Sequence, residues 1–214
     1  KHVHIASRTE ADLNTAADTI RAKHPCEVTV HALDLGKSGD QLTLAQRCGG
    51  VDILINNAGA IPSGGILDVN EDRWREAWDA KVFAYIGATR AAMRHMRDHK
   101  RGGVILNVIG IGGEAPQWGY AAGSTGNAAL IAFSKAMGGH SVDYGIRVNA
   151  VNPGPVDTER MIKINKRRAI DVYGDESKWD SLHQHYPGQR AASADDSRMW
   201  SMRRPRLRRN ASWR

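Results

Sequence analysis

The chain has 214 residues, enough for one domain of ordinary size with a sizeable core. Hydrophobic residues make up 41% of it, yet no apolar run approaches the roughly 18 residues that cross a bilayer. No leader segment is visible at its start, so we expect a cytoplasmic protein without a membrane partner. This composition argues against a membrane-spanning or secreted class of protein.

The net charge of +7 is concentrated at one end of the chain. Residues 197–214 hold seven arginines and no acid, so residues 1–196 are neutral overall. Nucleic acid is therefore not expected as a partner of residues 1–196. The basic segment has two interpretations: an arm that binds RNA or a membrane, or a disordered tail, including one translated in a wrong reading frame. We prefer the second, and expect a domain at 1–190 and a basic tail at 191–214.

Short β-branched runs alternate with amphipathic stretches along the chain. We expect strands at 2–6, 27–33, 51–56, 103–109 and 146–151. We expect helices at 9–24, 39–48, about 70–100 and about 120–139. This alternation is typical of βαβ units, and it predicts an α/β fold with a parallel sheet that helices cover on both faces. Ligands of such sheets bind outside the carboxyl ends of the strands.

One of these strands ends in Asn56-Asn57-Ala58-Gly59. Glycine at this point permits a tight turn against a ligand, and the two amides can tie neighbouring strands together. An ordinary strand-ending turn is the alternative, because asparagine and glycine are common in turns.

Cysteine and histidine give no reason to predict a metal site. Cys26 and Cys48 form no Cys-x-x-Cys pair and lie in separate predicted elements, so idle or buried thiols are expected. His2 and His4 share one side of a strand, which a partly exposed edge explains. A second pair, His95 and His99, lies on a polar helix face, where surface histidines are expected.

Four motifs, in this order and spacing, resemble the short-chain dehydrogenase/reductase family. They are "ASR" with "ALDL" after the first two strands, "NNAG" at 56–59, "GYAAGSTGNAALIAFSKAMGG" from residue 119, and "YGIRVNAVNPGPVDTERM" at 144–161. The resemblance covers about residues 3–190. It implies a Rossmann-like doubly wound sheet that binds NAD(P) and moves a hydride between nicotinamide and a carbonyl or alcohol carbon of a small molecule.

The family's glycine-rich turn after its first strand has no counterpart here. In the family's sheet that strand is central, between the strands that are here 2–6 and 51–56. We therefore expect the first strand and the last strand of the fold to be missing or altered, and the others to form two groups with unpaired inner edges. Either the chain is a fragment of a longer protein or a partner fills the position.

The resemblance also implies a set of residues that bind the cofactor. Ser7 and Arg8 follow the first strand, where the family binds the adenosine ribose. A guanidinium there favours the 2′-phosphate of NADP, with NAD as the alternative cofactor and an exposed helix-start arginine as the alternative role. The other implied contacts are Asp34, Leu35, Asn57, Ala58, Gly59, Pro153, Gly154, Val156 and Thr158. Asp34 could equally cap the helix that follows it.

The catalytic set matches the family at one position of four. The family uses a tyrosine, a lysine four residues later, a serine and an asparagine; Tyr120 matches the tyrosine. Ser124 stands at the lysine position, Gly110 or a neighbour at the serine position, and Lys81 at the asparagine position. A phenol with a pKa near 10 needs a nearby cation to act near neutral pH.

Two interpretations of this set stay open. In one, Lys81 supplies the positive charge to Tyr120 from a different place in the chain, and Ser124 is an additional hydrogen-bond donor. In the other, Lys81 is a helix lysine that extends to solvent, and the protein is a non-catalytic nucleotide-binding or interaction domain, with a tail that could bind nucleic acid. The resemblance further implies a homo-oligomer formed through the helices at 70–100 and 120–139.

Overall fold

The computed structural model describes residues 1–59 and 61–193. The chain divides into two compact units, Lys1–Asn152 and Pro153–Arg214. Except for its first three residues, the predicted basic tail lies outside the described part, and the predicted domain boundary stays a prediction.

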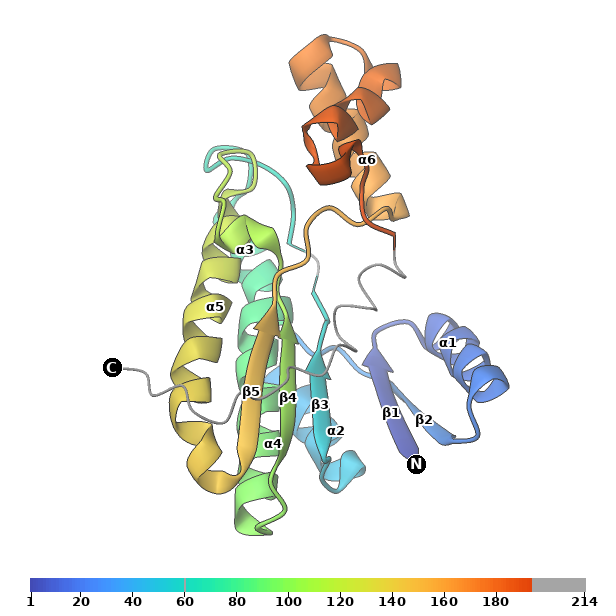
Figure 1. Ribbon diagram of the computed structural model, residues 1–214, viewed down its shortest axis with the longest axis vertical. Helices are drawn as coiled ribbons and strands as arrows, with labels where there is room; N and C mark the ends of the chain where they lie inside the picture. Colours follow the sequence, from blue (N-terminus) through green and yellow to red (C-terminus); the bar gives the residue numbers. More distant parts are fainter. Residues whose placement is uncertain (60, 194–214) are drawn as a thin grey trace. The chain divides into compact units, whose positions relative to one another are not determined.

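The strands of the first unit pair in parallel and form two sheets. Its described strands are β1 (His2–Ser7), β2 (Glu27–Ala32), β3 (Ile53–Asn56), β4 (Gly103–Val108) and β5 (Ile146–Val151). The order is β1-β2 in one sheet and β3-β4-β5 in the other, with every described pair parallel (Figure 1). The predicted α/β class is confirmed, and each strand lies within two residues of its predicted bounds.

The division into two sheets agrees with the two groups of strands that the sequence predicts. Within the described part of the chain, β1 does not pair with β3. Ile53 and Ile55 of β3 keep 62% and 60% of their surface exposed, whereas Leu54 and Asn56 are turned toward the helices. The exposed isoleucines show that one face of β3 is left without an apolar cover from described residues.

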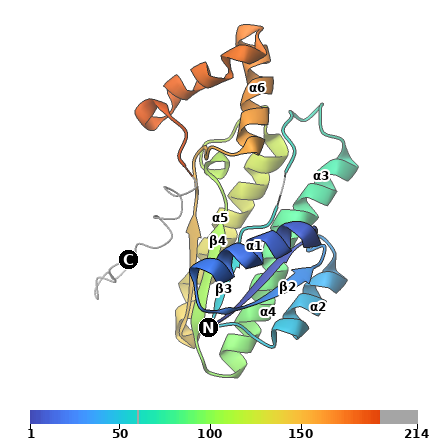
Figure 2. The ribbon, with the colours of Figure 1, turned by 90° about the vertical axis from the view of Figure 1, so that its right-hand side faces the viewer.

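Helices pack on both sheets of this unit. They are α1 (Glu10–Lys23), α2 (Ser38–Cys48), α3 (Glu71–Trp78), α4 (Ala84–Asp98) and α5 (Ala121–Ser141). The first packs against β1 and β2, whereas α4 and α5 pack against the three-stranded sheet, and α2 contacts α4 (Figures 1 and 2). These contacts hold the carboxyl ends of the strands on one edge, as parallel pairing requires.

The single helix predicted over 70–100 is corrected by the structure. A π-helical turn, Asp79–Phe83, separates α3 from α4. The amide N–H of Ala84 donates to the carbonyl oxygen of Asp79, five residues back, instead of four. Such a turn adds one residue within a continuous helix and has no residue signature of its own, so the sequence pattern over 70–100 was interpreted as one helix. Its consequence is that Lys81 lies in the turn with its side chain buried.

Apolar side chains from α4, β4 and β5 form the core of the three-stranded sheet. Ala92 and Met96 of α4 pack on Ile105, Ile146 and Val148. A second cluster toward the carboxyl edge consists of Val82, Tyr85, Ile109 and Leu130. The two clusters fix α4 against the strands and bring the π-helical turn to the edge where the strands end.

The second unit is built on α6 (Glu159–Tyr173) and a 3-10 segment, Glu176–His185. Thr158 caps α6, since its hydroxyl accepts a hydrogen bond from the third N–H of the helix. Ala169 and Leu182 are buried where the two segments pack. This unit thus has a small apolar centre of its own.

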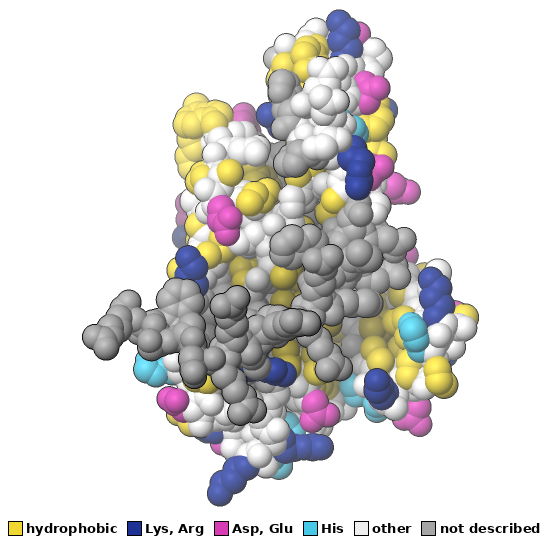
Figure 3. All heavy atoms as spheres, viewed as in Figure 1, with side chains coloured by type: hydrophobic (Ala, Val, Ile, Leu, Met, Phe, Trp, Pro, Cys, Tyr) yellow, Lys and Arg dark blue, Asp and Glu magenta, His cyan; other side chains and the backbone are white. Residues whose placement is uncertain are grey.

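In the described part of the chain, no helix is long and apolar enough to cross a membrane. Lys and Arg side chains are interspersed with Asp and Glu over the described residues of the face in Figure 3. Among the described residues of that face, the two signs of charge lie close together over most of the surface, in agreement with the neutral charge of residues 1–196.

Replacing Met96 by alanine should destabilise the fold by about 2–5 kcal/mol, because the side chain is fully buried and its loss leaves a cavity. The same change at Met93, which is only partly buried against the same cluster, should cost less. Urea denaturation of the full chain gives both values. Equal losses for Met96→Ala and Met93→Ala would contradict this description of the core.

Candidate functional site

A chain of buried polar side chains joins β3 to β4 where both strands end. Asn56 and Asn107 are opposite each other in the parallel register, and the Asn56 amide nitrogen donates to Asn107 Oδ1 at 2.8 Å. The same nitrogen donates to Thr89 Oγ1 on α4 at 3.1 Å. Asn107 Nδ2 donates to Ser134 Oγ on α5 at 2.8 Å. The predicted tie between neighbouring strands is therefore present, and it is made by the first asparagine of "NNAG".

Gly59 ends the turn that follows β3, at a point where the backbone lies against the Lys81 side chain. Its φ is +131°, a conformation that residues with side chains rarely adopt. A Cβ placed there would lie 2.7 Å from Lys81 Cβ and 2.8 Å from Lys81 Cγ. Glycine is therefore required both for the conformation and for the space that the lysine stem occupies.

The Lys81 ammonium is held inside the protein. The residue is only 8% exposed, and Nζ donates to the carbonyl oxygen of Ile109 at 2.7 Å and to Asn127 Oδ1 at 2.8 Å. A lysine that extends to solvent does not fit this burial, so that part of the second interpretation is wrong, whereas the non-catalytic domain that went with it stays a prediction. A buried cation is retained only where acceptors compensate its lost hydration, and here two oxygens do so.

Tyr120 lies at the start of α5 beside the loop that follows β4. A Cβ on Gly112 of that loop would lie 3.4 Å from Tyr120 Cδ1 and 3.5 Å from Asn127 Nδ2. The Tyr120 ring and the Asn127 amide therefore flank the same short stretch of backbone. Because Lys81 donates to Asn127, the structure gathers a phenol, an amide and an ammonium at the carboxyl end of β4.

Asn127 is a site residue that the motif comparison did not single out. It is seven residues after Tyr120 on α5, which is two helical turns, so both lie on the same helix face. It is 3% exposed. The helical spacing was a usable signal, but nothing in the sequence links residue 127 to a lysine at 81.

Ser124 binds the loop before Tyr120 instead of the reacting edge. Its Oγ accepts a hydrogen bond from the backbone N–H of Gln117 at 3.1 Å, and the side chain is buried. This contact holds the segment leading to Tyr120 against α5. Its expected role as an additional hydrogen-bond donor stays a prediction.

A second tyrosine near the edge has a structural function. The Tyr85 hydroxyl donates to the carbonyl oxygen of Val108 at 2.8 Å. Burial raises the pKa of this hydroxyl well above its ordinary value of about 10. Tyr85 therefore stays protonated near neutral pH.

The predicted cofactor contacts of the first unit follow the strand ends. Arg8 is exposed directly after β1 and makes no ion pair with another described residue. Ser7 ends the same strand, and its hydroxyl is 3.5 Å from the Thr9 carbonyl oxygen. Asp34, after β2, accepts from the Gly36 N–H at 3.1 Å through Oδ1. A guanidinium and a carboxylate at adjacent strand ends fit the phosphate and amino groups of a nucleotide.

The remaining turn residues of the first unit are partly accessible. Asn57 is exposed, whereas Ala58 is half-buried between it and Gly59. Leu35 is half-buried, and its carbonyl oxygen accepts from Gln41 Nε2 at 2.8 Å. These positions line the same edge as Arg8 does, at the ends of β2 and β3.

Four predicted contacts belong to the second unit. Val156 forms an isolated parallel bridge with Ala192, and Thr158 caps α6. Pro153 and Gly154 open the unit, and a Cβ on Gly154 would meet no atom within 4 Å. Thr158 therefore has a structural partner, and the cofactor role of all four stays a prediction.

Comparisons with known proteins agree on one family. A family model described as short chain dehydrogenase matches residues 1–169. A Mycobacterium tuberculosis protein, (5R,7aS)-5-hydroxy-7a-methyl-1-oxo-2,3,5,6,7,7a-hexahydro-1H-indene-carboxyl-CoA reductase, is 36% identical over 110 residues, which are 50% of this chain and 41% of that protein. The Escherichia coli protein named uncharacterized oxidoreductase YohF is 32% identical over 154 residues, 69% of this chain and 61% of that protein.

A solved structure extends the likeness to the fold. L-Sorbose reductase from Gluconobacter frateurii, complexed with NADPH and L-sorbose, matches with a TM-score of 0.83 at 28% identity, over 94% of this chain and 78% of that chain. The chain spans about half the length of the curated relatives it matches.

The contact between Gly59 and Lys81 gives a prediction for stability. Gly59→Ala should destabilise the chain by about 2 kcal/mol or more, since it adds a backbone strain and an overlap with the lysine stem. Gly49→Ala is the matched control: φ is +61° there and no atom lies within 4 Å of the added Cβ, so the expected cost is about 1 kcal/mol.

Urea midpoints of the two variants compare these costs. A Gly59→Ala variant as stable as Gly49→Ala would mean that the lysine stem does not pass where the structure has it.

Proposed function

The chain belongs to the short-chain dehydrogenase family, and we propose that it is an NADP-preferring oxidoreductase. The reaction is transfer of a hydride between nicotinamide and the carbonyl or alcohol carbon of a small molecule. The observation that carries the proposal is the buried Lys81 ammonium, which donates to Asn127 beside the Tyr120 ring. The chain spans only part of the length of its relatives. For that reason the oxidoreductase activity itself, and not only its substrate, is part of the proposal.

Tyr120 is the proposed proton donor or acceptor. A free phenol has a pKa of about 10, and a cation within a few ångströms favours the phenolate. Lys81 is the proposed source of that charge, with Asn127 holding its ammonium in place. Ser124 supports the loop before Tyr120 through Gln117. A bound nicotinamide cofactor would supply or accept the hydride, and the protein's own residues would position and protonate the oxygen.

The proposed cofactor contacts begin with Ser7 and Arg8. The exposed guanidinium suits the 2′-phosphate of NADP, while NAD is the alternative. Asp34 retains one carboxylate oxygen outside the bond to Gly36 for an adenine amino group. The further proposed contacts are Leu35, Asn57, Ala58, Gly59, Pro153, Gly154, Val156 and Thr158.

A homo-oligomer through α4 and α5 belongs to the same proposal. Partly buried apolar side chains of both helices, Ile86, Met93, Phe133 and Met137, line a shallow groove together with arginines of α4. Such a surface suits a second copy of the chain better than solvent.

The second candidate function is a nucleotide-binding or interaction domain without turnover. Two observations favour it. Ser124, which stands where the family has its lysine, accepts a hydrogen bond from the Gln117 N–H. Gly110, at the position of the family's serine, offers no hydroxyl. Losing such groups usually costs several orders of magnitude in rate. NADPH consumption with a panel of aldehydes, ketones and quinones separates the two functions, and binding of NADPH without consumption would favour the second.

Replacing Lys81 by methionine should lower the rate of NADPH consumption about 100-fold or more, because the charge that favours the Tyr120 phenolate is lost. Lys135→Met, on the exposed face of α5, is the control and should leave the rate unchanged. Circular dichroism and NADPH binding show whether each variant is folded. Unchanged turnover in folded Lys81→Met would exclude the lysine as the source of charge.

Replacing Arg8 by alanine should weaken NADPH binding about 10-fold or more and leave NADH binding nearly unchanged, because only NADPH carries the 2′-phosphate. Arg101→Ala, at the opposite end of the strands, is the control. Fluorescence titration with both nucleotides measures the ratio. Equal losses for NADH and NADPH would show that Arg8 does not bind the phosphate.

A further inference from the structure

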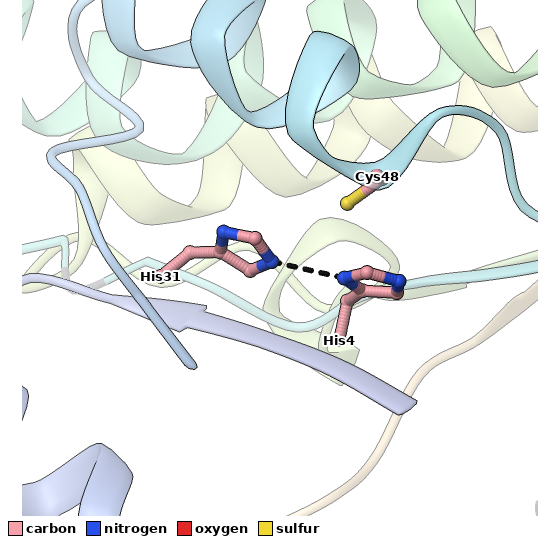
Figure 4. A group of neighbouring side chains, drawn as sticks. All are labelled: His4, His31 and Cys48. Carbon is pink, nitrogen blue, oxygen red and sulfur yellow. Dashed lines mark hydrogen bonds between the residues drawn. The ribbon is translucent and has the colours of Figure 1, made fainter. Parts of the chain in front are cut away.

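Three side chains that can bind a metal ion meet away from the proposed reacting edge. They are His4 of β1, His31 of β2 and Cys48, the last residue of α2. One ligand atom from each lies within 4.8 Å of the other two, and Figure 4 shows the sulfur beside the two rings. His4 Nδ1 and His31 Nε2 are 2.9 Å apart. Among the described residues, these are the histidine, cysteine or acidic side chains that gather as a group of three close enough to hold a metal ion.

The sheet register explains why the two imidazoles face the same way. His4 is opposite Thr29 in the parallel pair, and His31 is two residues further along β2. Residues two apart on a strand point to the same face, so both rings project toward α2. Cys48 reaches this face because α2 ends beside it. Two strands and a helix end therefore supply one ligand each.

Burial favours the uncharged form of all three side chains. The pKa of His4 is lowered by burial and, to a smaller extent, by His2. The pKa of His31 is lowered by burial and then by the neighbouring His4, Arg47 and His2. Both rings are therefore neutral near pH 7, the form that coordinates a cation. Burial raises the pKa of the Cys48 thiol, which stays protonated until a metal displaces its proton.

The spacing is close to that of a tetrahedral site. Zinc takes histidine nitrogen at about 2.0–2.1 Å and cysteine sulfur at about 2.3 Å, which puts ligand atoms about 3.3–3.6 Å apart. The two imidazole nitrogens are closer than this, at 2.9 Å, and all three ligand atoms lie within 4.8 Å of one another. Small rotations of the side chains would equalise them. The charge of neighbouring Arg47 opposes a cation only weakly, because that side chain is exposed and screened.

We propose that His4, His31 and Cys48 bind a zinc ion, with a water molecule or an added ligand in the fourth position. Two imidazoles and one thiolate form a donor set of borderline softness, which favours Zn²⁺ over Mg²⁺ or Ca²⁺. The ion ties the end of α2 to the β1-β2 sheet, whose strands lead to Ser7 and Asp34. This site does not depend on the proposed oxidoreductase activity.

Co²⁺ bound to the full-length chain is the first test, because its spectrum reports the ligands directly. The expected result is one Co²⁺ per chain, with a thiolate-to-metal charge-transfer band and the intense visible bands of four-coordinate cobalt, both lost on adding Zn²⁺. Competition with a chromophoric chelator then gives the Zn²⁺ affinity. A chain that binds no Zn²⁺ in this competition would overturn the proposal.

Variants assign the site to these three residues. Cys48→Ser and His4→Gln should each weaken Zn²⁺ binding at least about 100-fold and remove the charge-transfer band or alter the visible bands. Cys26→Ser and His24→Gln, beside the start of β2, are the matched controls and should change neither. Circular dichroism of each metal-free variant establishes that it is folded. A band that survives in Cys48→Ser, or one that disappears in Cys26→Ser, would assign the metal elsewhere and sink the proposal.

Discussion

The hydrogen bond between Asn56 and Asn107 is the constraint on which the candidate site depends. Both amides are buried, and an amide without a partner in such a place costs several kcal/mol, so the two strands are stable only in the register that pairs them. Thr89 and Ser134 continue the chain of bonds to α4 and α5. A slip of β3 by one residue would break both bonds of the Asn56 amide, since it meets Asn107 and Thr89 only in this alignment. The pairing therefore sets the level at which both strands end and at which their loops begin.

Lys81 uses the edge that this pairing creates. A buried ammonium needs acceptors, and it finds the Ile109 carbonyl oxygen just after β4 and the Asn127 amide on α5. Three local features make its position possible: a π-helical turn that holds the residue, a glycine at 59 that leaves space for the stem, and an asparagine two turns after Tyr120. Removing either acceptor would leave a poorly compensated charge inside the protein, so these features act together. The same arrangement holds the ammonium on Asn127, whose amide and the Tyr120 ring flank Gly112.

The strands of the first unit, the positions of its helices and their order could be predicted from local sequence patterns, whereas α6 of the second unit was not predicted. Even the division into two sheets followed from the strand order that the family resemblance implies. Contacts between distant residues could not be predicted. The π-helical turn has no residue signature of its own, so 70–100 was interpreted as one helix, and Asn127, a hydrogen-bond partner of Lys81, is 46 residues away. The cluster of His4, His31 and Cys48 was missed for a similar reason: its members are on three elements and have no motif spacing, although parallel pairing of the first two strands would have put both histidines on one face.

The two sheets of the first unit are joined by helices instead of by strand pairing. Gln41 of α2 packs so closely on α4 that a Cβ on Gly87 would overlap its side-chain oxygen, and its amide nitrogen donates to the Leu35 carbonyl oxygen after β2. Helix α2 thus links the end of one sheet to the helix that covers the other. Arg8 and Asp34 stand on the first sheet and Gly59 on the second, so any ligand that contacts all three draws the two sheets together. By mass action such a ligand stabilises the arrangement that binds it, and it does so most where hydrogen-bonded strands do not already fix that arrangement.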